Sequence, residues 1–345
     1  MTWHIKTGHV LDVLAELEPE SVQTCVTSPP YWGLRDYGDG GQAWPAVTYA
    51  PMPGLPPLDI PSQTVPLGLE PDPWAYVGHL VEVFRGVRRV LRDDGTLWLN
   101  LGDSYASNSD RASMKLGAHK KGCLCSYCTM PQTGLKARVP AGLKPKDLCG
   151  IPWRVAYALQ ADGWYLRSDI IWHKPNPMPE SVTDRPTKAH EYLFLLTKDR
   201  RYFYDADAIR QPAVTFGDSI DRPDTTGAAK RADLGQMART TPVGRTCGVH
   251  ASGGRNARSV WTITTRPYSA AHFATFPPDL PERCIKAGSR PGDLVLDPFS
   301  GAGTTGMVAR RLQRSYIGAE QSEEYAEMSR RRIEGDAPLF NRGSA

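Results

Sequence analysis

A hydroxyl, two prolines and two aromatic rings follow directly on an apolar run, in the order Thr27-Ser28-Pro29-Pro30-Tyr31-Trp32. Because proline fixes φ and lacks an N–H, the strand predicted for Val22 to Val26 must stop at this turn. The turn presents the Ser28 hydroxyl and the Pro29 carbonyl as hydrogen-bond acceptors beside two aromatic rings. Such a set suits a flat ring that carries an amino group, such as a nucleobase.

Three glycines form a second turn that could bind a ligand. Gly301, Gly303 and Gly306 follow the apolar run Leu294 to Leu296 and open a predicted helix. Strand, glycine turn and helix in this order are typical of nucleotide-binding turns, where the backbone must approach the ligand closely. Glu320 ends the next predicted strand, where a carboxylate can bind ribose hydroxyls. The pattern predicts a nucleoside cofactor without identifying it.

The elements that must position these turns alternate along the chain and predict a doubly wound, parallel α/β sheet. The strands are expected at residues 3–10, 22–26, 96–101, 164–172, 191–197, 294–296 and 315–319, and the helices at residues 10–17, 74–91, 151–161, 305–312 and 323–333. Residues 33–73 form a long Gly- and Pro-rich loop, either functional or partly disordered. Residues 104–150 and 205–260 interrupt the alternation.

The composition is that of an ordinary globular protein, with 345 residues, 40% hydrophobic, 23% charged, and a net charge of +4. No apolar run approaches the roughly 18 residues of a membrane span, and the first residues lack the features of a signal peptide. We therefore expect a cytoplasmic protein. Seven unevenly spaced cysteines argue against a disulfide framework.

The turn Thr27 to Trp32, joined to Asp297 to Gly303, resembles the amino-methylating DNA methyltransferases that use S-adenosylmethionine. Three further segments are similar to segments of that family: Gly163 to Pro177, Pro179 to Pro186 and His272 to Pro277. The catalytic motif precedes the cofactor motif, as in the family's β arrangement. The resemblance implies a circularly permuted, Rossmann-like methyltransferase sheet of seven mostly parallel strands, one of them antiparallel at the edge, with inserted DNA-recognition segments.

The same resemblance divides the chain into functional regions. Residues 1–103 and 151–204 would form the catalytic half, and residues 261–345 the half that binds S-adenosylmethionine. Residues 104–150 are a basic insertion: from Arg111 to Lys146 there are eight Lys or Arg and no Asp or Glu, as expected where a protein contacts DNA phosphates. Residues 205–260 occupy the place of the target-recognition region.

The exocyclic amine of a base is a poor nucleophile, because its lone pair is delocalised into the ring. Acceptors aimed at its N–H bonds favour the pyramidal form that develops in the transition state. We expect Ser28 Oγ and the Pro29 carbonyl to be these acceptors, Pro30 to complete the turn and Tyr31 to stack on the base. The target nucleotide must first flip out of the duplex.

The resemblance assigns the remaining site residues. The cofactor-binding residues would be Asp297, Phe299, Ser300, Gly301, Gly303, Thr304, Thr305, Glu320, Phe273 and Thr275. The base pocket and the DNA contacts beside it would involve Trp32, Arg35, Asp184 and Arg185. Family members often carry Gly-Asp after the first strand, and the Gly8-His9 of this chain puts that contact to the adenine of the cofactor in doubt.

The residue at position 28 bears on which base is methylated. Serine is typical of family members that make N4-methylcytosine, whereas those that modify adenine N6 mostly carry aspartate. We expect cytosine N4, with adenine N6 as the alternative, since a hydroxyl both donates and accepts. A nicotinamide (NAD)-dependent oxidoreductase would share the glycine turn but leave Ser-Pro-Pro-Tyr unexplained. A silent DNA-binding protein would not need both motifs intact.

Three cysteines of the basic insertion, Cys123, Cys125 and Cys128, have a spacing that suggests a structural zinc, with Cys149 or His119 as the fourth ligand. Incidental free thiols are the alternative, since the set is only part of a zinc signature. The expected partner is double-stranded DNA, and a cognate restriction endonuclease would accompany the enzyme if it belongs to a restriction-modification system. The sequence leaves the oligomeric state open.

Overall fold

The computed structural model of the protein describes residues 2–33, 41–106, 139, 142–212, 254–265 and 276–336. The chain divides into two compact units, one formed by Met1–Tyr204 with Ser259–Ala345 and the other by Asp205–Arg258. The second unit closely follows the region 205–260, whose role in target recognition stays a prediction. It contains a 3₁₀ turn, η2 (Asp207–Ile209), and strand β10 (Gln211–Pro212) paired antiparallel with β11 (Gly254–Arg255).

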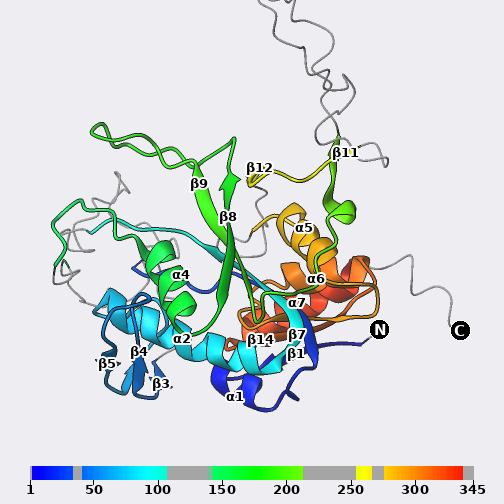
Figure 1. The fold of residues 1–345 in the computed structure, drawn as a ribbon, viewed down its shortest axis with the longest axis horizontal. Helices are drawn as coiled ribbons and strands as arrows, with labels where there is room; N and C mark the ends of the chain where they lie inside the picture. Colours follow the sequence, from blue (N-terminus) through cyan, green and yellow to red (C-terminus); the bar gives the residue numbers. More distant parts are fainter. Residues whose placement is uncertain are drawn as a thin grey trace, which may run out of the picture. The chain divides into compact units, whose positions relative to one another are not determined.

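The first unit holds the other elements (Figure 1). Its strands are β1 (Trp3–Thr7), β2 (Val22–Thr27), β3 (Gln42–Trp44), β4 (Val47–Tyr49), β5 (Leu58–Ile60), β6 (Gln63–Val65), β7 (Leu91–Leu101), β8 (Tyr165–His173), β9 (His190–Thr197), β12 (Val260–Thr262), β13 (Leu294–Asp297) and β14 (Ser315–Glu320). Its helices are α1 (Val10–Ala15), α2 (Pro73–Val90), α4 (Ile151–Ala161), α5 (Asp279–Gly288), α6 (Thr304–Arg311) and α7 (Glu323–Gly335).

One large sheet has the strand order β1-β14-β13-β2-β7-β9-β8-β12. It contains the seven expected strands and one more, β12, whose three residues are too few to produce a recognisable pattern. Strand β9 runs antiparallel to both of its neighbours, β7 and β8, while the other pairings are parallel. The expectation of an antiparallel strand at the edge was wrong, because β8 and β12 lie beyond β9.

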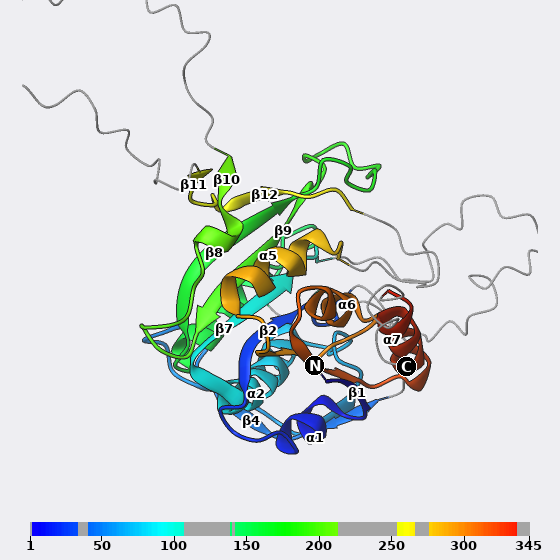
Figure 2. The ribbon, with the colours of Figure 1, turned by 90° about the vertical axis from the view of Figure 1, so that its right-hand side faces the viewer.

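Helices cover both faces of this sheet, as a doubly wound fold requires. Helices α1, α2 and α4 pack together on one side, and α5, α6 and α7 on the other (Figure 1). The first and last elements meet, as the circularly permuted sheet implies: β1 pairs parallel with β14, and α7 packs against β1 (Figure 2). No helix among the described residues combines the length and the apolar character of a membrane span.

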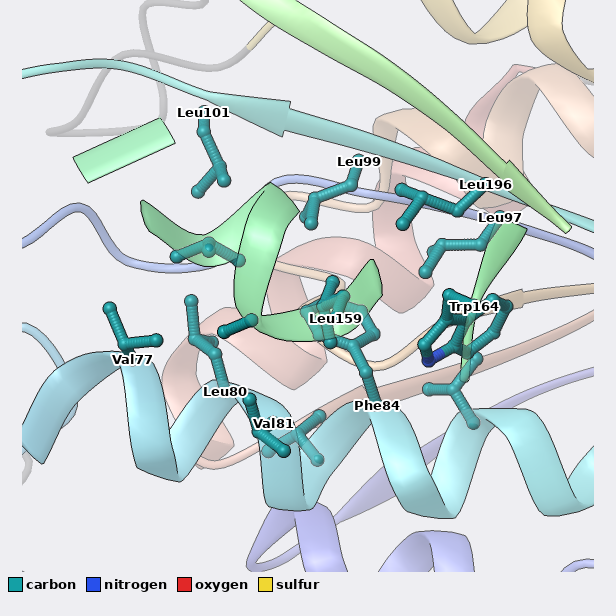
Figure 3. Close-up of a cluster of buried hydrophobic side chains, with 14 of the residues drawn as sticks. Val77, Leu80, Val81, Phe84, Leu97, Leu99, Leu101, Leu159, Trp164 and Leu196 are labelled. Carbon is teal, nitrogen blue, oxygen red and sulfur yellow. The ribbon is translucent and has the colours of Figure 1, made fainter. Parts of the chain in front are cut away.

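The core beside the catalytic strand forms between α2 and β7. Helix α2 begins where Asp72 accepts the N–H of Trp74 at 2.8 Å and Pro73 fills the first turn. In Figure 3 its side chains Leu80 and Phe84 lie below Leu97 and Leu99 of β7, with Leu159 of α4 between them. These residues are fully buried. The packing fixes β7 next to β2.

Several boundaries differ from the sequence-based expectations. Residues 41–73 are not a loose loop: β3 pairs with β6 and β4 with β5, and Trp44 and Tyr49 are buried against α2. Strands of three residues among prolines carry too little periodicity to be recognised. Strand β7 begins at Leu91, directly after the helix, whereas the strand was expected to begin at residue 96. Helix α5 was not predicted.

Candidate active site

The turn after β2 and the turn after β13 lie at one edge of the sheet. The two strands pair in parallel, with Thr24 opposite Val295, so their carboxyl ends face the same way. Thr27 Oγ1 donates to Asp297 Oδ1 at 2.6 Å, and Thr305 Oγ1 donates to Asp297 Oδ2 at 2.7 Å. One buried carboxylate thus joins two segments that are 270 positions apart in the chain.

Asp297 was expected to contact the cofactor, but its carboxylate has another task. The residue is 1% exposed, and Oδ1 also accepts the N–H of Phe299 at 3.0 Å. Burial raises the pKa of Asp297 to about 6, although the bonds from Thr27, Thr305 and Phe299 oppose that rise. The carboxylate acts as a bracket between the turns, and its predicted contact with the cofactor stays a prediction.

The glycine turn is shaped for a close approach of its backbone. Gly303 has φ of 73° and caps α6, and a Cβ there would lie 2.3 Å from Ser329 Oγ, so only glycine fits. Gly301 also has a positive φ, and the N–H of Ser300 donates to the Ala319 carbonyl at 2.9 Å. Strand β14 therefore holds the turn in place.

The hydroxyl side chains of this turn point into the protein. Ser300 Oγ lies 3.0 Å from Tyr316 Oη, and Thr304 Oγ1 accepts from Arg332 at 2.9 Å. Ser300, Thr304 and Thr305 are all buried. These three side chains therefore support the turn, and their predicted role in binding the cofactor stays a prediction.

Glu320 ends β14 beside the glycine turn. Its Oε2 accepts the N–H of Gly301 at 2.7 Å and its Oε1 accepts the N–H of Ser322 at 3.1 Å. A carboxylate oxygen has a second lone pair, so the partly exposed Glu320 suits the ribose hydroxyls of a nucleoside cofactor. The nearby His9 uses Nδ1 to accept the N–H of Leu11 at 3.2 Å, so this departure from the family pattern serves as a helix cap.

Ser28 borders a hydrogen-bonded network that the sequence did not reveal. Ser28 Oγ lies 3.3 Å from both Asn100 Oδ1 and Tyr31 Oη. Tyr31 Oη lies 2.8 Å from Glu191 Oε2 and 3.0 Å from Asn100 Oδ1, and donates to one of these acceptors. The Asn100 amide donates to the Tyr192 carbonyl at 3.0 Å and to Glu191 at 3.3 Å. These bonds turn Asn100 Oδ1 toward Ser28.

The charges in this network fix the direction of its protons. Glu191 Oε1 accepts from the Lys174 ammonium, which lies 4.3 Å from the centroid of the Trp172 ring. Burial and the neighbouring Glu191 carboxylate hold the pKa of Tyr31 well above its ordinary value, so the phenol stays protonated. With Asn100 Oδ1 as acceptor for the Ser28 proton, the lone pairs of Ser28 Oγ are available to an incoming amine.

The turn is supported from α2 and from the preceding small strands. Tyr76 Oη donates to the Pro30 carbonyl at 2.7 Å. The buried Trp32 donates through Nε1 to the Glu70 carbonyl at 3.0 Å, and the Gly33 N–H donates to Gly68 at 2.8 Å. Trp32 therefore lies in the wall behind Ser28. Its contact with a base, and the stacking of Tyr31 on a base, remain predictions.

A fully buried acid–imidazole pair underlies this support. Glu70 Oε1 lies 2.9 Å from His79 Nδ1, and neither side chain is exposed. Glu70 Oε2 accepts the N–H of Gly68 at 2.8 Å, and Trp44 stacks on the His79 ring with centroids 4.5 Å apart. The pair fastens residues 41–73 to α2, and through Gly68 and Trp32 it fastens the catalytic turn.

Asp184 and Arg185 lie on the loop between β8 and β9. The Arg185 guanidinium lies 3.9 Å from the centroid of the Tyr105 ring and pairs with Glu180 at 2.6 Å, and Asp184 pairs with Lys146 at 2.5 Å. Their role in the base pocket stays a prediction. Some predicted residues lie outside the described part of the chain: Arg35, Cys123, Cys125, Cys128, His119, Phe273 and Thr275.

Cys149 is the one predicted zinc ligand that lies among the described residues. It is 1% exposed within the hydrophobic core, and burial raises the pKa of its thiol, whereas zinc binds the thiolate. Among the residues that the structure describes, no three His, Cys, Asp or Glu side chains gather as a metal site. The zinc site, with Cys149 or His119 as the fourth ligand, stays a prediction.

Sequence reasoning missed the residues that support Ser28 from a distance: Asn100, Glu191, Lys174, Tyr76, Glu70 and His79. Only Asn100 carried a signal, as the one polar residue in the apolar run Leu97 to Leu101.

The comparisons with known proteins agree with this geometry. A family model described as DNA methylase, of the N6/N4 methyltransferases, matches residues 22–331. The Type II methyltransferase M.SmaI of Serratia marcescens is 44% identical over 95% of this chain and 90% of its own length. M.Cfr9I of Citrobacter freundii, also a Type II methyltransferase, is 42% identical over 95% and 87%.

Two solved structures share the fold. The PvuII DNA methyltransferase, described as cytosine-N4-specific, superposes with a TM-score of 0.57 at 19% identity and covers 99% of this chain and 92% of its own. A protein of Thermus thermophilus, described as a putative DNA modification methylase and complexed with S-adenosyl-L-methionine, gives a TM-score of 0.55 at 22% identity, with 98% of both chains covered.

Proposed function

This chain belongs to the N6/N4 family of DNA methylases, and from that premise we propose that it transfers a methyl group from S-adenosylmethionine to N4 of a flipped-out cytosine in double-stranded DNA. The observation that carries the choice of cytosine is Ser28 at the end of β2, where a neutral hydroxyl stands in place of a carboxylate. The alternative is the same reaction at adenine N6.

The network around Ser28 supports this role. Asn100 Oδ1, 3.3 Å from Ser28 Oγ, accepts a hydrogen bond from the Ser28 hydroxyl. The lone pairs of Ser28 Oγ are then free to accept a hydrogen bond from an N–H of the cytosine amine. The Pro29 carbonyl is the second acceptor. Holding both N–H bonds favours the pyramidal amine of the transition state, because these acceptors are fixed before the reaction begins. After methyl transfer the cationic methylamino group would release one proton to solvent, and the cofactor would leave as the neutral thioether S-adenosylhomocysteine.

The glycine turn supports the choice of cofactor. S-adenosylmethionine, when bound, supplies an electrophilic methyl group on sulfonium. Glu320 would hold its ribose, the backbone of Gly301 and Gly303 would line its binding surface, and Phe299 would pack beside it. Because the Asp297 bracket joins this turn to Thr27, the methyl group and Ser28 are held in one geometry, and such positioning lowers the barrier.

Mass spectrometry of modified nucleosides tests the proposal. The protein is expressed in a host without DNA methylation, and its DNA is digested to nucleosides. We expect N4-methylcytosine, absent from cells that carry the Ser28→Ala variant; N6-methyladenine in its place would refute the choice of base. Sequencing of modified bases in the same DNA reports the recognition sequence. Binding of NAD instead of S-adenosylmethionine in calorimetry would favour the oxidoreductase.

We also propose that the basic insertion, residues 104–150, contacts DNA phosphates and that residues 205–260 read the target. Phosphate contacts weaken as salt rises, so removal of Lys144 and Lys146 would reduce the salt dependence of DNA binding. A structural zinc on Cys123, Cys125 and Cys128 is tested by elemental analysis of the purified protein. Protein without stoichiometric zinc would remove that idea.

A further inference from the structure

The loop between β8 and β9, residues 174–189, leaves the sheet at the edge that carries Ser28. Strand β9 is antiparallel to both β7 and β8, so β8 runs parallel to β7 and, through it, to β2. The carboxyl end of β8, at His173, therefore lies at the same edge as the catalytic turn. The loop projects beyond the strand ends in both views (Figure 1, Figure 2).

Both ends of this loop are fastened to the sheet. Lys174 bonds to Glu191 of the Ser28 network, and Lys188 donates to the Asp103 carbonyl at 3.2 Å. Asn176 makes two bonds to Thr265, from Nδ2 to the carbonyl at 3.3 Å and from the Thr265 N–H to Oδ1 at 3.1 Å. Both ends of the loop are thus fixed at the sheet edge that carries Ser28.

Between these anchors stands an apolar side chain with no apolar cover. Met178 is 86% exposed, more than any other large hydrophobic residue among those described. Pro177 and Pro179 flank it, and because proline fixes φ and lacks an N–H they stiffen the backbone on both sides. A single exposed methionine is ordinary. This one stands between two prolines in a loop that leaves the sheet at the edge carrying Ser28.

The charges near Met178 allow a polyanion to approach. The two acidic residues of the loop are each paired: Glu180 with Arg185 at 2.6 Å, and Asp184 with Lys146 at 2.5 Å. Lys146 belongs to the basic insertion and is 83% exposed. The loop therefore presents no unpaired carboxylate to phosphate.

We propose that Met178 enters the base stack of the DNA duplex when the target nucleotide leaves it. This inference rests on the proposed function. Eversion of a base costs a few kcal/mol of stacking and pairing, and apolar side chains such as methionine stabilise distorted duplexes by inserting between bases. The unbranched thioether adapts to an irregular gap.

The test compares two duplexes that carry the recognition sequence found by sequencing. In one duplex the target cytosine is paired with guanine; in the other it faces an abasic site, so that the pairing is already lost. We expect Met178→Ala to lower the methylation rate roughly tenfold on the paired duplex, consistent with the cost of unstacking. On the abasic duplex we expect less than about a twofold loss, because less of that cost remains.

Two variants complete the comparison. Met178→Phe keeps a large apolar group and is expected to retain most of the activity on the paired duplex. Met52→Ala, at a residue 40% exposed in the turn between β4 and β5, is the matched control and should leave both rates unchanged.

The outcomes separate this proposal from the proposed function. Wild-type protein that methylates no DNA removes both. If the wild-type protein is active but Met178→Ala is unaffected, or loses activity equally on the two duplexes, then the insertion of Met178 is refuted and the proposed function stands. Since the side chain is exposed, all variants should unfold at the same denaturant concentration, and a lower midpoint for Met178→Ala would also count against the proposal.

Discussion

The cofactor turn and the catalytic turn share one sheet edge but are held in different ways. In the cofactor turn, carboxylates accept nearby backbone N–H groups, as Glu320 does from Gly301 and Asp297 from Phe299. The catalytic turn is held by side chains that arrive from distant segments, among them Asn100, Glu191 and Tyr76. These two partners of the cofactor turn lie 2 and 19 positions away in the chain, whereas those of the catalytic turn lie 46 to 160 positions away, and only the nearer set leaves a motif in the sequence.

The largest effect is expected at the residue that both regions serve. Ser28→Ala removes the proposed acceptor of the amine and should lower the methylation rate by about two to three orders of magnitude, as loss of one preorganised transition-state hydrogen bond does elsewhere. Transfer of a radiolabelled methyl group to DNA measures the rate. A variant with full activity would show that the two turns meet for another reason.

The buried Glu70–His79 pair below the catalytic turn is expected to affect the stability of the protein more than its activity. Glu70→Ala leaves the buried His79 ring and the Gly68 N–H without their partner, which should lower the free energy of unfolding by about 2 kcal/mol. Denaturant titration measures this loss. Glu82→Ala is the control, because Glu82 is a partly exposed residue of α2, the helix that carries His79. Similar losses of stability for both variants would show that the Glu70–His79 pair has no special role.

Glu191 tests whether the distant network positions Ser28. Glu191→Gln keeps the shape but loses the charge that faces Lys174 and Tyr31, so kcat should fall roughly tenfold, in line with a lost charged hydrogen bond. The KM for S-adenosylmethionine should not change, because the cofactor turn is held separately. Glu327→Gln on α7 serves as the control. A raised KM with unchanged kcat would break the distinction between the two regions.

The smallest effect concerns the bracket itself. The folded-state pKa of Asp297, raised from 3.8 to about 6, means that the folded protein binds the proton more tightly than the unfolded chain does. This group therefore favours folding most at low pH, and the contribution is lost as pH rises through about 6. From about pH 5 to about pH 7, wild type should lose ~1 kcal/mol more stability than Asp297→Asn. Parallel stability curves for the two proteins would show that Asp297 is not so perturbed.

Much of the fold could be predicted from the sequence, because continuous apolar runs such as Val22 to Val26 and Leu294 to Leu296 mark buried parallel strands. The small strands between Gln42 and Val65 could not, since three-residue strands have no measurable period. The cofactor turn was recognised from its glycines, yet the inward direction of Ser300 and Thr304 was missed. Side-chain direction depends on neighbours such as Tyr316 and Arg332, which lie on other elements.

The strand order also constrains how the protein is made. Strands β13 and β14 are synthesised after all other strands, yet they occupy the places between β1 and β2. While the chain leaves the ribosome, β1 has no neighbour and β2 is open along one side. The interior of the sheet closes only when the last part of the chain has emerged, so nascent protein that stops short of this point lacks both the cofactor turn and the bond from Thr27 to Asp297.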